Sequence, residues 1–173
     1  MANGLIIVSS GTLVSQPNPI YAEWDRRAAE IADPRERYRY LLTANSYGAN
    51  HISTGLLDRI LATAMLPKTA TARQRFKTML WEGFKHDLAE RRQETRDWIG
   101  AGRLSAPTLV VWGQNDPSAR FETDGIAALK LFLPATPSAD ALILNRAGHY
   151  VYREQPEMFC RAVTEFLATR CAA

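Results

Sequence analysis

Residues 107–117 have the sequence PTLVVWGQNDP. Apolar and β-branched residues run without interruption to Trp112, which is the pattern of a strand buried on both faces of a parallel sheet. The Gly-Gln-Asn-Asp-Pro that follows has the composition of a turn. Asp116 is therefore predicted to lie just beyond the carboxyl end of a strand, where ligands and catalytic groups collect in open parallel sheets.

Two further stretches have the same apolar pattern. Residues 4–8 (GLIIV) end in Ser-Ser-Gly, and residues 141–144 (ALIL) end in Asn-Arg-Ala-Gly-His, which brings His149 to a strand end. Helices are predicted over 123–133 and from 155 or 156 to 170. Three buried strands separated by helices predict an α/β fold with a parallel sheet and right-handed crossovers.

The segment between the first two strands is helical in character. Helices are predicted over 20–31, 35–45 and 54–65, and a longer amphipathic helix carries an apolar face made of Phe76, Met79, Leu80, Phe84 and Leu88. This block is too long for a simple crossover. We therefore predict a core strand in residues 1–15, an inserted all-helical lid in 16–103, and the rest of the core in 104–173.

The composition is ordinary for a globular chain, with 46% hydrophobic and 23% charged residues among 173. No apolar run approaches the about 18 residues of a membrane span, and no charged segment precedes the short N-terminal apolar run. We expect a cytoplasmic protein without a membrane partner, in which Cys160 and Cys171 are free thiols. No spacing of residues indicates a metal site or a cofactor.

Positive charge gathers in residues 68–103, which hold nine Lys and Arg against five Asp and Glu. This region could favour an anionic substrate, or it could be a solvated helix with ion pairs one turn apart. Acidic residues interrupt the basic ones, and no aromatic platform accompanies them. The sequence therefore does not favour nucleic-acid binding.

Asp116 and His149 are the residues with the clearest chemistry. Adjacent parallel strands would present both side chains at one edge of the sheet, where the Asp could accept the Nδ1–H of the His and fix its tautomer. The His would then act as a general base. Each residue also has a structural explanation, since Asp116 could cap a turn and His149 could be an ordinary loop histidine.

The stretches that carry these residues resemble the closing third of an α/β-hydrolase: VVWGQND over 110–116, AGHY over 147–150 and EQPEMF over 154–159. Residues 4–12 (GLIIVSSGT) are similar to the strand that precedes the helical lid of that family. The resemblance implies a partial α/β-hydrolase fold with three parallel strands. It also implies that Asp116 and His149 are the acid and the histidine of a catalytic triad.

Within this superfamily the chain looks most like the hydrolases that cleave carbon–carbon bonds in ring-fission products. The resemblance implies that Tyr150 is the aromatic residue after the catalytic histidine, where that subfamily usually has Trp. It also implies that Arg59 is the lid arginine that binds a substrate carboxylate, although Arg59 is one residue out of register. Packing of Tyr150 in the wall and solvation of Arg59 are the alternatives.

The nucleophile of the triad has no convincing candidate. The family places it in a G-x-S-x-G turn, which this sequence lacks. Ser9 has Gly11 at +2 but the bulky Ile7 at −2, and the residues that would form an oxyanion hole are not recognisable either. We therefore expect a fragment whose isolated chain is inactive.

Three functions follow from this expectation. The first is a hydrolase acting on a small-molecule ester or vinylogous diketone, with its serine supplied from outside the chain. The second is an inactive fragment that serves as a binding or dimerisation module. In either case an N-terminal half chain or a second copy would cover the open sheet edge. The third is a lyase or cyclase that uses Asp116 and His149 without a nucleophile.

Overall fold

The computed structural model of the chain describes residues 3–14 and 18–171. Its sheet contains β1 (Leu5–Val8), β2 (Thr108–Gly113) and β3 (Ala139–Leu144), all parallel, in the order β1-β2-β3. The three predicted strands and their parallel pairing are thereby confirmed. The boundary predicted between residues 15 and 16 lies outside the described residues.

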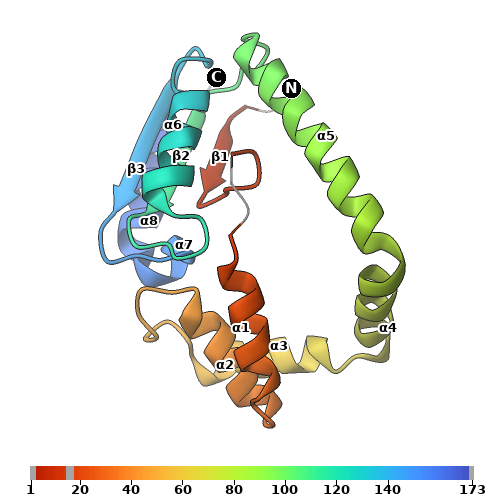
Figure 1. Cartoon of the computed structure of the whole chain (residues 1–173). Coiled ribbons are helices and arrows are strands. Elements are labelled where there is room, and N and C mark those ends of the chain that lie inside the picture. Colours follow the sequence, from red (N-terminus) through yellow and green to blue (C-terminus); the bar gives the residue numbers. More distant parts are fainter. Residues whose placement is uncertain (1–2, 15–17, 172–173) are drawn as a thin grey trace.

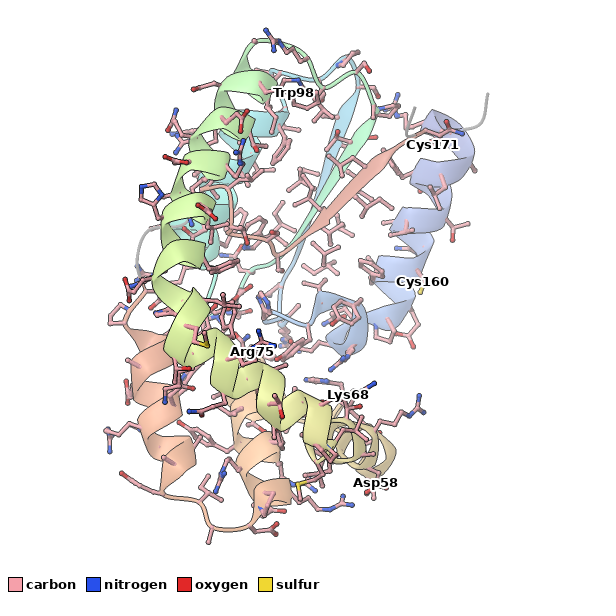
Figure 2. The ribbon with its side chains drawn as sticks, turned by 90° about the vertical axis from the view of Figure 1, so that its right-hand side faces the viewer. Asp58, Lys68, Arg75, Trp98, Cys160 and Cys171 are labelled. Atoms are coloured by element: carbon pink, nitrogen blue, oxygen red, sulfur yellow. The ribbon has the colours of Figure 1, made fainter. Side chains whose placement is uncertain are left out.

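The central strand β2 is buried along its whole length because both faces of the sheet are covered. Val110 and Trp112 face one apolar cluster with Phe132 of α6 (Ile126–Phe132). Leu109 and Val111 face another cluster, which includes residues of α8 (Pro156–Arg170). This alternation follows from the two-residue period of a strand. Figure 2 shows α8, which carries Cys160, on the opposite side of the sheet from α5.

The block between β1 and β2 is helical, as predicted. It contains α1 (Ile20–Ala29), α2 (Pro34–Ala44), α3 (Thr54–Ala64), α4 (Pro67–Arg75), a π-helical turn (Phe76–Leu80) and α5 (Trp81–Gly100). Side-chain caps explain two of the starts: Asp33 accepts the amide of Arg35, and Ser53 accepts that of Leu56. Figure 1 shows α1, α2 and α3 beyond the carboxyl ends of the strands, with α5 returning toward the sheet.

Two helix predictions need correction. The helix predicted over 123–133 begins earlier, in a π-helical turn at Phe121–Gly125. The terminal helix is preceded by a separate short helix, α7 (Val151–Glu154), which the sequence analysis missed. Gln155 leaves the helical conformation between them with φ −135°, as expected of the residue before Pro156. This break leaves Glu154 at the end of α7, close to His149.

The amphipathic face predicted around residues 76–88 exists but is uncovered. Phe76 is 39% exposed and Met79 is 71% exposed, and Leu80 and Phe84 are also exposed. The aromatic rings of Phe76, Trp81 and Phe84 pack on one another. In this chain the face therefore contacts no sheet or helix that would bury it, within the described ranges.

The charged side chains of α5 interact mainly with neighbours on their own helix. Lys85 pairs with Glu82 at 2.8 Å, and Arg91 pairs with Glu94. These exposed pairs favour the solvated-helix interpretation of the basic region over an anion site. Cys160 and Cys171 are free thiols, as predicted. No helix within residues 3–14 and 18–171 has the length and apolar character needed to cross a membrane.

Candidate active site

Asp116 and His149 meet at the carboxyl edge of the sheet. Asp116 follows β2 and His149 follows β3, and the Nδ1 atom of His149 lies 2.8 Å from Oδ2 of Asp116. The Asp116 side chain has no exposed surface, whereas the imidazole of His149 is 33% exposed. One member of the pair is therefore held inside the protein, and the other reaches the solvent side of the edge.

The loop after Asp116 fixes the orientation of its carboxylate. Oδ1 accepts the amides of Ser118 and Ala119, each at 2.9 Å, and the Ser118 hydroxyl at 3.0 Å. With Oδ1 engaged in this Asx turn, Oδ2 is the oxygen left to face His149. Sequence reasoning missed Ser118, although an Asp-x-Ser spacing after a strand is a signal for such a turn.

The Ser118 hydroxyl also fixes the tautomer of His149. Its oxygen lies 3.2 Å from His149 Nδ1. Because the hydroxyl donates its single proton to Asp116, it can only accept from the imidazole. Both contacts at Nδ1 therefore require the proton on that nitrogen, which leaves Nε2 unprotonated in the neutral ring and able to accept a proton.

Gly113 explains the Trp-Gly pair at the end of β2. A Cβ at this position would meet the backbone of Ala147 and Gly148, with the Ala147 carbonyl oxygen at 2.5 Å. The His149 loop therefore lies directly on the end of β2, and any larger residue would push the two apart. This close approach brings His149 within hydrogen-bonding distance of Asp116.

Tyr150 packs beside the histidine, in the wall position that the sequence analysis considered. Its ring centroid lies 5.6 Å from those of His149 and of His51, which lies between α2 and α3. Burial raises the pKa of the Tyr150 phenol, and a hydrogen bond with Asn45 opposes that rise. Asn45 also accepts the backbone amide of His149 through its carbonyl, at 3.1 Å. No pattern in the sequence indicates this contact between the end of α2 and the histidine.

Asp116 and His149 form a dyad. Within the described ranges, no contact brings Arg59 or Ser9 to this dyad. Arg59 is exposed on α3. Ser9, at the end of β1, has a left-handed φ of 41° but is only 1% exposed. Its hydroxyl accepts the amide of Gly113 at 3.4 Å. These placements give no support for Ser9 as a nucleophile or for Arg59 as a ligand of the same site.

One group of side chains has the composition of a metal site. His86, Asp87 and Glu90 of α5 offer ligand atoms within 4.8 Å of one another, and all three are exposed. Exposed acidic groups commonly occur without a metal, and this group belongs to a different element from those that carry the dyad. It does not contribute to the chemistry of Asp116 and His149.

His51 provides a pH-dependent contribution to stability. Burial lowers the pKa of His51 below the ordinary value of 6.5. The charge of Glu154 opposes this shift, and the charge of Arg153 adds to it. The unfolded chain therefore binds the proton more readily, so stability present above pH 6.5 is lost as the pH falls toward the lowered pKa. We expect His51→Gln to lose less stability than the unsubstituted chain between pH 7 and pH 5 in urea titrations. His86→Gln, at an exposed position, is the control, and an unchanged slope in His51→Gln would contradict the assignment.

Comparisons with known proteins find hydrolases that are similar to this chain. No protein-family model matches the sequence. The 2-hydroxy-6-oxononadienedioate/2-hydroxy-6-oxononatrienedioate hydrolase of Cupriavidus pinatubonensis is 36% identical over 87 residues, which are 50% of this chain and 28% of that protein. The corresponding enzyme of Paraburkholderia xenovorans is 35% identical over 88 residues, 50% of this chain and 29% of that protein.

Solved structures match nearly the whole chain. A serine hydrolase involved in carbazole degradation (CarC) superposes with a TM-score of 0.64 and 22% identity, covering 98% of this chain and 55% of the other. A meta-cleavage product hydrolase from Pseudomonas fluorescens (CumD) gives a TM-score of 0.63 and 20% identity, covering 95% and 55%. The chain thus spans about half the length of these solved proteins.

Proposed function

We propose that Asp116 and His149 are the acid and the base of a serine hydrolase. The chain is related to the α/β-hydrolases and corresponds to their C-terminal part. The observation that carries the proposal is the 2.8 Å contact between His149 Nδ1 and the fully buried Asp116 Oδ2. The serine nucleophile and the oxyanion donors come from outside this chain, so the isolated chain is inactive. The cytoplasmic location inferred from the sequence stays a prediction.

The proposed reaction is attack of the serine on a carbonyl carbon. His149 Nε2 takes the proton of the serine hydroxyl and later returns it to the leaving group. The buried carboxylate of Asp116 stabilises the imidazolium that forms between these steps. The hydrolases that share 35–36% identity suggest a vinylogous diketone as substrate, cleaved at a carbon–carbon bond, with an ester as the simpler carbonyl compound.

The test combines this chain with an N-terminal hydrolase half that carries a G-x-S-x-G turn. We expect hydrolysis of a p-nitrophenyl ester or of a 2-hydroxy-6-oxo-dienoate, followed by absorbance. His149→Ala should abolish it, whereas His86→Ala, at an exposed histidine of α5, should not. Activity that survives His149→Ala would refute the assignment of the base.

A second role as a binding or dimerisation module is favoured by the open edge of the sheet. β1 pairs only with β2 within the described ranges, so its other edge has unpaired backbone groups. An apolar hollow of about 330 Å³ follows this edge. It is lined by residues of β1 and α5, among them Ile7 and Trp98, and by Phe132. Either an N-terminal half chain or a second copy of this chain would cover it.

Sedimentation of the purified chain separates the two roles. A well-folded homodimer that gains no activity with an N-terminal half would favour the module over the hydrolase. A chain that binds the N-terminal half and becomes active would favour the hydrolase.

A further inference from the structure

One carboxylate, that of Glu154 at the end of α7, joins the loop after α2 to the histidine loop. Its Oε2 accepts the backbone amides of Tyr47 at 2.8 Å and Gly48 at 3.1 Å, both in the loop after α2. Its Oε1 accepts the amide of Gly148 at 2.9 Å, next to the histidine. One side chain thus satisfies three backbone donors in two segments about 100 residues apart in the sequence.

The two segments also contact each other directly. A Cβ on Gly148 would meet the amide nitrogen of Tyr47 at 2.5 Å and the backbone of Ser46, so only glycine permits this approach. The amide of the next residue, His149, donates to the carbonyl of Asn45 at 3.1 Å. The backbone of residues 45–48 therefore packs directly against the loop that carries the histidine.

The charge of Glu154 is suited to this position. The amides of Tyr47 and Gly48 follow the end of α2 and have no carbonyl partner within a helix, so an outside acceptor satisfies them. Hydrogen bonds from backbone amides to a carboxylate are shorter and about twice as strong as neutral ones. A carboxylate offers one oxygen to each segment, whereas a side-chain amide has a single acceptor oxygen for all three donors.

We propose that Glu154 is a positioning residue that couples docking of the lid segment 45–48 to the placement of His149, so that the two form and break together. The inference rests on the proposed function for the role of His149, but the coupling itself is a property of the folded chain. Closing of the lid segment 45–48 onto Glu154 brings the Asn45 carbonyl to the His149 amide. When the segment leaves, the His149 amide loses its acceptor, and of its three backbone donors Glu154 keeps only the amide of Gly148.

The direct test is Glu154→Gln in the full chain, followed by amide hydrogen exchange and by the imidazole ¹⁵N shifts of His149. Glutamine keeps the shape but loses the charge and one acceptor oxygen. We expect the amides of Tyr47 and Gly48 to exchange roughly 10-fold faster or more, the effect of losing one charged hydrogen bond, and the His149 shifts to move. Glu157→Gln is the matched control, because Glu157 is exposed in the first turn of α8 and has no hydrogen bond within the described ranges.

A merely structural role of Glu154 would lower the stability of the chain without selectively speeding exchange at Tyr47 and Gly48 or moving the His149 shifts. If Glu154 only stabilised α7, exchange would rise across α7 and leave Tyr47 and Gly48 unchanged. Exchange of those two amides within twofold of the unsubstituted chain, together with unchanged His149 shifts, would overturn the proposal.

A measurement on the unsubstituted chain covers the case in which Glu154→Gln does not fold. In native-state exchange at low urea, amides that open together share one opening free energy and one urea dependence. We expect Tyr47, Gly48, Gly148 and His149 to behave in this way. Opening of the lid amides at least 10-fold more often than those of Gly148 and His149 would overturn the coupling. Neither measurement uses activity, so coupling without hydrolysis would refute only the proposed function.

Discussion

Asp116→Asn, in this chain combined with an N-terminal hydrolase half, is expected to lower kcat by on the order of 10³- to 10⁴-fold with little change in KM. An asparagine can turn its NH₂ group toward His149 Nδ1, and that arrangement requires the proton on Nε2. The imidazole would then be a donor where the reaction needs a base. The buried carboxylate that stabilises the imidazolium would also be lost. Steady-state rates on a p-nitrophenyl ester measure both parameters.

Asp140→Asn is the control for this substitution. Asp140 is a half-exposed carboxylate on β3 that pairs with Arg170 at 3.0 Å, far along the strand from the carboxyl edge. We expect its kcat to stay within about twofold, because exposed ion pairs contribute little. A loss of kcat in Asp116→Asn no larger than that in Asp140→Asn would argue against a catalytic role for the buried carboxylate.

Trp112→Ala is expected to have the largest effect on stability, a loss of about 3–5 kcal/mol in the free energy of unfolding. Trp112 is fully buried in the central strand, and its indole N–H donates to the carbonyl of Ala119 at 2.8 Å. The substitution leaves a cavity and removes the partner of that carbonyl. Because domains are stable by only about 5–15 kcal/mol, we expect a markedly smaller folded fraction at 25 °C than in the unsubstituted chain. Urea unfolding followed by circular dichroism measures the change.

Trp98→Ala is the matched control, since the Trp98 side chain on α5 is 41% exposed and removal of it opens no enclosed cavity. We expect a loss of roughly 1 kcal/mol or less, as for partly exposed positions. Trp112→Phe separates volume from hydrogen bonding, because it keeps most of the ring. If Trp112→Ala and Trp98→Ala unfolded at the same urea concentration, the apolar cluster around β2 could not be the main source of stability.

The strands and the dyad could be predicted because local patterns determine them. A continuous apolar run such as residues 108–112 is typical of a strand buried on both faces, and parallel strands end at one edge. Asp116 and His149 each follow such a run directly. Their proximity, confirmed at 2.8 Å, thus needed no knowledge of the rest of the chain.

The contacts of the lid could not be predicted in the same way. The amides of Tyr47 and Gly48 carry no side-chain signal, and their acceptor, Glu154, lies more than 100 residues away. The apolar face at Phe76 and Phe84 was visible in the sequence, but its exposure depends on which elements surround it. Tertiary contacts of this kind are not encoded in the period of a helix or a strand.

The path of the chain between β1 and β2 has a consequence for how such proteins diversify. The chain leaves at the carboxyl end of β1, forms α1, α2 and α3 beyond that edge, and returns through α4 and α5, whose Ile99 packs against the sheet (Figure 1). The segment that covers the carboxyl edge of the sheet is therefore also part of the crossover that joins the neighbouring strands β1 and β2. Insertions or deletions in α3 can therefore change the covering segment while α5 still leads to β2 at Thr108 and the pairing of the strands is kept.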